Sequence, residues 1–220
     1  MIQKITINFL KSLQINNNKP WFDANKKSYE EARAAFIDCV QNIIPVIAKF
    51  DGDIGNLTAK ECIFRINRDV RFSKDKRPYK NNMAAYFNRA GKKGTGAGYY
   101  LHIEPGQSFA AAGIWMPESD GLGKIRQEID YNFDEWKKII GSTVFKKQFI
   151  AGIDRSNSLV RPPKGYDEEN AAIDFIKLKS FVATKAFTDA DTMSKTFITE
   201  LSKTFKTVKP MIDFINRSLD

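Results

Sequence analysis

The sequence predicts an α+β fold, in which helices from both chain ends pack on a central antiparallel meander of about four strands. Two observations support this prediction. Alternating apolar and polar residues are grouped between residues 62 and 116, and apolar residues recur at helical spacing before and after that region. A length of 220 residues with 42% apolar content is enough for a buried core. We expect a single domain covering residues 1–220, and no internal repeat is visible.

The first fifty residues predict two helices. Apolar side chains at helical spacing indicate a short amphipathic helix over residues 5–15, and an asparagine-rich run that closes with a proline ends it. A longer helix is expected from about Trp21 or Asp23 to Phe50, with a kink at Pro45.

The middle of the chain predicts strands. Four segments carry the pattern of a half-buried strand: residues 62–66, 83–89, 98–105 and 108–116. The glycine-rich loop at residues 91–98 is too short for a crossover helix, so the strands around it should form an antiparallel hairpin. A tight turn is expected at Pro105.

After Pro117 the apolar spacing is again helical. The predicted elements are helices over residues 119–129, 135–140, 144–150 and 168–179, a strand over 180–187, and a long helix capped by Ser194 with a bend expected near Pro210. Helices at both ends of a strand-rich centre are what the α+β prediction requires.

Most of the positive charge lies in one stretch, residues 60–93. This stretch holds eleven Lys and Arg against three acids, a balance of +8 in a protein of net charge +9. Arg65, Arg68 and Arg71 alternate with apolar residues, so the guanidinium groups lie on an element that must also pack. We therefore predict an anion-recognising surface or cleft here, since the planar guanidinium suits carboxylate and phosphate.

The predicted ligand-binding residues are Arg65, Arg68, Asp69, Arg71, Lys76 and Tyr79. Two other interpretations of this stretch stay open. Asp69, Asp75 and Glu61 would pair with the arginines if the cluster were purely structural. Alternatively, the whole basic stretch and its glycine-rich loop would follow a nucleic-acid backbone.

Tyr100, His102 and Glu104 alternate along one predicted strand, so their side chains should share a face of the sheet. A histidine beside a carboxylate and a phenol is a candidate group for proton transfer. The other interpretation is a hydrogen-bonded histidine on a half-buried sheet. The small residues at 110–113 leave space over this face, either for a ligand or for a closely packed helix.

Several classes of site are disfavoured by composition. Cys39 and Cys62 form no C-x-x-C pair, and a single histidine cannot supply a multi-histidine zinc site. We expect no metal and no cofactor. No apolar run is long enough for a membrane span and no signal peptide is visible, so a cytoplasmic location is expected.

The run Arg65-x-x-Arg68-Asp69-x-Arg71-Phe72-x-x-Asp75-Lys76-x-Pro78-Tyr79 resembles the signature of a family of bacterial conserved hypothetical proteins, a domain of unknown function. Further similar segments lie at residues 17–23, 96–106, 178–181 and 209–216. The resemblance covers nearly the whole chain, and it implies no activity, ligand or catalytic residue.

The residues themselves favour a protein that binds a small phosphate- or carboxylate-bearing ligand, and they leave open whether it is an enzyme. A nucleic-acid-binding module and a purely structural arginine cluster are the alternatives. A cleft that encloses the cations would favour the small ligand, whereas a long open basic stripe would favour nucleic acid.

Overall fold

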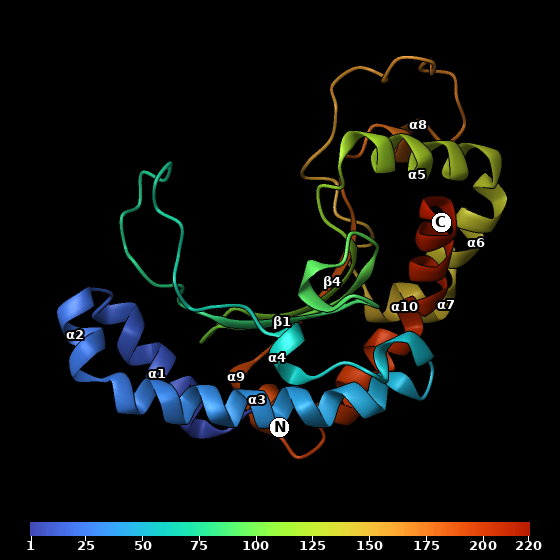
Figure 1. Ribbon diagram of the computed structural model, residues 1–220. Helices are drawn as coiled ribbons and strands as arrows, with labels where there is room; N and C mark the ends of the chain where they lie inside the picture. The colour runs from blue at the N-terminus through green and yellow to red at the C-terminus, as the bar shows by residue number, and fades with distance from the viewer.

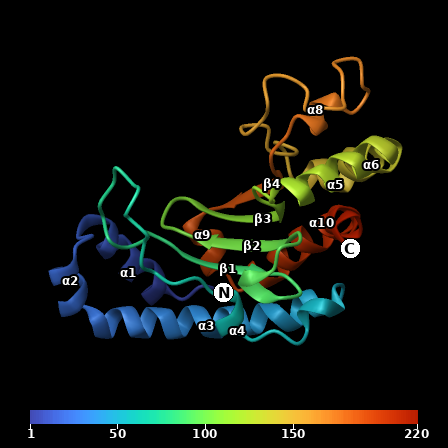
Figure 2. The same cartoon turned by 45° about the horizontal axis from the view of Figure 1, so that its top comes forward.

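The computed structural model describes residues 1–220 and has a four-stranded antiparallel sheet at its centre (Figures 1 and 2). The strands, in spatial order, are β1 (Met83–Phe87), β2 (Gly98–Ile103), β3 (Ser108–Ile114) and β4 (Phe181–Phe187). The α+β prediction and its central antiparallel sheet are confirmed. The fourth strand, β4, corresponds to the strand predicted over residues 180–187, and it pairs with β3.

The predicted strand at residues 62–66 is wrong. Residues Ala59–Cys62 form the short helix α4, because the Glu61 carboxylate accepts hydrogen bonds from the N–H and the hydroxyl of Thr58 and so caps the helix start. The chain then runs extended along β1 with only isolated bridges, such as Ile63 to Ala85. The local cap outweighs the alternating pattern that predicted a strand.

Three helices precede α4: α1 (Lys4–Ile15), α2 (Lys19–Ala24) and α3 (Lys26–Ala48). The helix at 5–15 is confirmed, but the predicted single helix over 21–50 is interrupted at Asn25. The Asn25 side chain donates to the Trp21 carbonyl at 2.8 Å and competes with the helical ladder. A single 3₁₀ turn, η1 (Gly52–Ile54), follows α3, and another, η2 (Gly91–Lys93), lies between β1 and β2.

Six helices lie after β3. They are α5 (Ser119–Tyr131), α6 (Phe133–Gly141), α7 (Thr143–Gln148), α8 (Ile173–Ile176), α9 (Asp189–Met193) and α10 (Phe197–Leu219). Of the helix predicted over 168–179, only α8 forms. Asp167 and Asn170 accept hydrogen bonds from the N–H groups of Glu169 and Ala172, and these local turns replace the missing helix.

The two faces of the sheet differ. Along β2, Tyr99, Leu101 and Ile103 are fully buried in a core that extends to residues of α3 and α10. Tyr100 and His102 point to the opposite face, which no helix crosses in Figures 1 and 2. None of the helices combines the length and the apolarity needed to cross a bilayer.

Tyr99 makes the fold sensitive to alkaline pH. Its hydroxyl donates to the buried Asp51 carboxylate at 2.8 Å. Burial, and then the charge of Asp51, raises the pKa of Tyr99 far above its ordinary value of 10.0. The folded state thus favours the neutral phenol, so its contribution is complete below pH 10 and falls as the pH rises further.

We expect the free energy of unfolding, measured in urea at pH 8, 10 and 11, to fall above pH 10, and to fall less steeply in Tyr99→Phe. At pH 8 this variant should be about 1–3 kcal/mol less stable, because it leaves Asp51 without its donor. An unchanged alkaline slope in Tyr99→Phe would contradict this explanation.

Candidate functional site

The uncovered face of the sheet forms the floor of a groove with a volume of about 970 Å³. Four residues from the four strands form one row across the floor: Tyr86, Tyr100, Ala111 and Thr184. One wall comes from the loop at residues 92–96 and another from residues 114–121. The short side chains of β3 therefore leave open space over the sheet. The other interpretation of the sequence, a helix packed closely on these residues, is not what the structure contains.

The wall at the end of β3 is held in an unusual backbone conformation. Trp115 and Met116 are 63% and 51% exposed, although both are large apolar residues that line the groove. Met116 has φ of 47°, the only positive φ of a residue other than glycine, and its N–H donates to the Ser180 hydroxyl at 3.0 Å. Strained backbone of this kind is costly, and it is enriched at binding sites.

A row of hydrogen-bonded side chains runs along β2 and ends at the groove. The Tyr100 hydroxyl lies 3.0 Å from His102 Nδ1, and His102 Nε2 lies 2.9 Å from Glu104 Oε2. The His102 ring stacks on Phe109, with centroids 4.6 Å apart. The prediction that these three residues share one face is confirmed, and of the three only Tyr100 lines the groove.

Two cations without acidic partners lie next to the groove. Neither Arg65 nor Lys80 forms an ion pair or a side-chain hydrogen bond within the chain. The Lys80 ammonium lies 5.5 Å from the ring centroid of Phe64, and Phe64 lines the groove beside Tyr100. Burial, reinforced by the charge of Arg65, lowers the pKa of Lys80, so the two like charges lie close together. An anion placed here would relieve that repulsion.

Three other arginines of the basic stretch, Arg68, Arg71 and Arg77, have partners inside it. Arg68 binds Asp75 at 2.8 Å and also donates to the Arg77 carbonyl at 3.0 Å. Arg71 makes two hydrogen bonds to Asp69, at 3.0 and 2.7 Å, with 76% of its side chain exposed. The three guanidinium groups Arg65, Arg68 and Arg71 therefore have three different surroundings.

The remaining predicted ligand residues also have structural contacts. Lys76 donates to the Val70 carbonyl at 3.0 Å. Tyr79 is buried, stacks on Phe22 with centroids 3.9 Å apart, and has both its N–H and its carbonyl bound by the Asn17 side chain. These contacts agree with the structural interpretation for this part of the signature. The proposed pairing role of Glu61 is not seen, since that carboxylate caps α4.

Sequence reasoning missed Lys80, Phe64 and Thr184. Lys80 directly follows the signature in the sequence. It lies beside Arg65 because its backbone N–H donates to the Ile66 carbonyl, a contact that the sequence does not reveal. It also missed how the glycine-rich loop is held. Asn88 donates to the carbonyls of residues 96 and 97, and Asn216 Oδ1 accepts from the Ala97 N–H at 2.7 Å.

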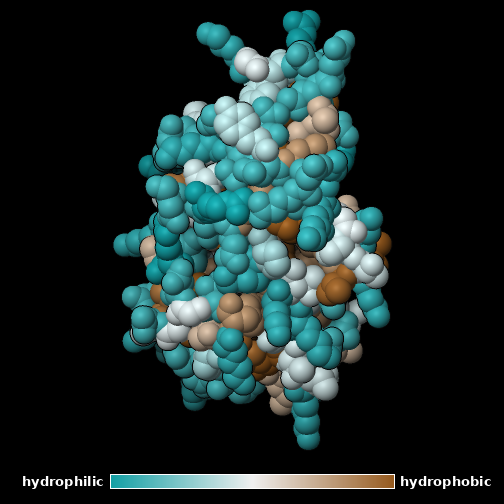
Figure 3. All heavy atoms as spheres, turned by 90° about the vertical axis from the view of Figure 1, so that its right-hand side faces the viewer, coloured by the Kyte–Doolittle hydropathy of each residue, from teal (hydrophilic) through white to brown (hydrophobic).

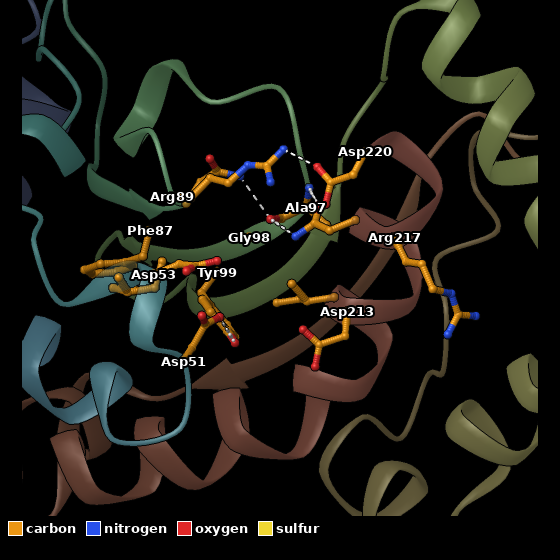
Figure 4. Close-up of a pocket in the computed structure, with 14 residues that line it drawn as sticks. Asp51, Asp53, Phe87, Arg89, Ala97, Gly98, Tyr99, Asp213, Arg217 and Asp220 are labelled. Carbon is orange, nitrogen blue, oxygen red and sulfur yellow. Dashed lines mark hydrogen bonds and ion pairs between the residues drawn. The ribbon is translucent and has the colours of Figure 1, made fainter.

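A second, smaller cavity of about 310 Å³ lies on the other side of that loop, and Figure 4 shows its lining. It is rich in acids, but most of them are already paired. Asp220 binds Arg89 at 2.6 Å, and Asp51 binds Tyr99. Arg217 points away from the cavity in Figure 4, toward Glu128 and Glu135. We therefore assign this cavity a structural role.

The side of the molecule at the right of Figure 1 offers no comparable feature. Figure 3, which views the molecule from the right-hand side of Figure 1, shows a mostly hydrophilic face with small, separate apolar groups. No three His, Cys, Asp or Glu side chains are grouped so that they could hold a metal ion. The aromatic-lined groove, with the two free cations beside it, is the strongest candidate site.

Comparison with known proteins identifies the family and nothing beyond it. The family described as "Conserved hypothetical protein (DUF2461)" matches residues 5–214. No curated protein and no solved structure matches the chain. The match covers the sheet, the basic stretch and both walls of the groove. The chain therefore belongs to the DUF2461 family of conserved hypothetical proteins.

Proposed function

We propose that this protein binds a small anion with a flat, apolar body in the groove over the sheet. The anionic group lies on Arg65 and Lys80, and the apolar body lies on Phe64 and Tyr100. The observation that carries the proposal is the pair of neighbouring cations without acidic partners beside an open, aromatic-lined groove. Lys80 is half-buried, whereas Arg65 is exposed to solvent. A half-buried charge normally has a partner, and a ligand anion would supply the one that Lys80 lacks while Arg65 holds the same anion from the solvent side.

The shape and charge of the site favour a small ligand over nucleic acid. The volume of about 970 Å³ lies at the upper end of the range for small-molecule sites. Arg68, Arg71, Arg77 and Arg89 each form an ion pair with a carboxylate of the chain. The basic stretch therefore does not present a continuous row of free cations to a phosphate backbone. Aromatic rings beside a cation suit a planar body that carries one charged end.

The test uses a double substitution and 8-anilinonaphthalene-1-sulfonate, a flat aromatic anion whose fluorescence reports binding. We expect Arg65→Gln with Lys80→Gln to raise its Kd about tenfold to a hundredfold, since two charge-assisted contacts are lost. Adenosine monophosphate, added to the wild type as a competitor, should displace the probe.

The matched control is Arg71→Gln with Lys74→Gln, which removes the same charge from the same stretch without touching the groove. Its Kd should stay within about twofold of the wild type. If the control loses the probe and the Arg65 and Lys80 variant keeps it, the anion site lies in the arginine loop. Preferential binding of decathymidylate, lost steeply between about 50 and about 200 mM salt, would instead indicate a nucleic-acid site.

A further inference from the structure

We infer that Tyr100 is a reactive hydroxyl, and that His102 takes its proton while it attacks an electrophilic centre of a ligand in the groove. The inference rests on the proposed function for its substrate, an anionic ligand that carries an acyl or phosphoryl group. A bond forms from Tyr100 Oη to the electrophilic carbon or phosphorus as the bond to the leaving group breaks. The phenolic proton passes to His102 Nδ1.

The donor and acceptor roles along the row follow from its chemistry. An ionised carboxylate only accepts hydrogen bonds, so the Nε2–H of His102 donates a hydrogen bond to Glu104 Oε2 at 2.9 Å. In the neutral imidazole, Nδ1 then has a free lone pair, and it accepts a hydrogen bond from the Tyr100 hydroxyl at 3.0 Å. When His102 gains that proton, the negative charge of Glu104 stabilises the imidazolium. Hydroxyl, imidazole and carboxylate thus stand in the order that activates nucleophiles in unrelated enzymes.

The surroundings hold this row in place. The His102 side chain is 13% exposed and its ring stacks on Phe109, which limits ring rotation. The Ser108 hydroxyl bonds both the N–H and the carbonyl of Glu104, at 3.1 and 3.0 Å, and so fixes the backbone that carries the carboxylate. A group fixed on a strand by packing and hydrogen bonds is preorganised for proton transfer.

The phenol itself requires a base. Burial, and then the charge of Glu104, raises the pKa of Tyr100 to about 12, so the free phenolate is scarce near neutral pH. A hydroxyl in this state reacts only when its proton leaves together with bond formation, and His102 Nδ1 is the base in contact with it. The other two tyrosines of the sheet have no imidazole partner: Tyr86 donates to the Gly96 carbonyl and Tyr99 to the Asp51 carboxylate.

Benzenesulfonyl fluoride, a flat aromatic electrophile, tests the inference without knowledge of the natural ligand. Attack by Tyr100 forms an Oη–S bond, breaks the S–F bond and releases fluoride, while the proton passes to His102. Labelling of each tyrosine is followed over time by peptide mass spectrometry. We expect Tyr100 to react about a hundredfold faster than Tyr131, which is 73% exposed and has no basic partner.

Variants of His102 and Glu104 show whether His102 acts as a base or only supports the structure around Tyr100. His102→Ala should slow Tyr100 labelling about a hundredfold. Added imidazole should restore at least about a third of the rate, whereas pyrazole, which has a similar shape but is a much weaker base, should not. Glu104→Gln keeps an acceptor for Nε2 but lacks the charge, and should slow labelling several-fold. Circular dichroism confirms that each variant is folded, and the comparison with Tyr131 needs no variant.

Three results would overturn the inference: labelling of Tyr100 no faster than of Tyr131, an unchanged rate in His102→Ala, or equal rescue by pyrazole and imidazole. Each would make the row a structural hydrogen-bond chain. Such a result would leave the anion proposal intact if the affinity for 8-anilinonaphthalene-1-sulfonate still depended on Arg65 and Lys80. If Tyr100 showed no enhanced labelling and the affinity for the probe did not depend on Arg65 and Lys80, the groove would be rejected as a functional site.

Discussion

Gly113→Ala is expected to lower the free energy of unfolding by about 3–5 kcal/mol, as measured by urea denaturation followed by circular dichroism. Gly113 lies in β3 with φ of 124°, a conformation that other residues rarely adopt. A Cβ built on it would lie 1.9 Å from the carbonyl oxygen of Phe181, an atom of the β4 backbone that cannot move alone. The added methyl must therefore push β3 and β4 apart. A loss of this size is a large part of the total stability of an ordinary domain.

Gly123→Ala is the matched control, since it makes the same substitution where the chain has room. Gly123 lies inside α5, and an added Cβ would meet nothing within 4 Å. Alanine should stabilise the helix by about 1 kcal/mol through its higher helix propensity. A Gly113→Ala variant as stable as the wild type would show that the β3–β4 contact is looser than described.

Much of the fold is predictable from the sequence because its signals are periodic. The alternation at Tyr99–Ile103 is read correctly because one face of β2 is buried completely. The errors occur where short polar side chains decide the local structure. The Glu61 cap changes a predicted strand into α4, and the turns at Asp167 and Asn170 shorten a predicted helix.

The candidate site is predictable only in part. The order Tyr100, His102 and Glu104 follows from alternation along one strand, so the sequence places them on one face. The grouping of Arg65 with Lys80 depends on the pairing of Lys80 with Ile66 across a loop, a long-range contact that periodicity does not contain. The arginine signature stands out by charge, yet Asp69 and Asp75 lie within it and pair with three of its four arginines.

Filling the groove should weaken ligand binding without unfolding the protein. Thr184 is exposed on β4 and lines the groove opposite Ala111, so a tryptophan there would occupy the space over the floor. Ala186 is the matched control, because it is exposed on the same face of the same strand, opposite Phe109, but does not line the groove. Neither substitution changes Arg65, Lys80 or the net charge.

The most direct measurement of the central claim is the Kd of 8-anilinonaphthalene-1-sulfonate for Thr184→Trp and Ala186→Trp, with the melting temperature of each variant recorded alongside. Binding in the groove predicts that Thr184→Trp raises the Kd at least about tenfold, a loss of about 1.4 kcal/mol, while Ala186→Trp binds as the wild type does. Both variants should melt within a few degrees of the wild type. Wild-type affinity in a folded Thr184→Trp variant would contradict the claim, because the anion would then bind outside the groove.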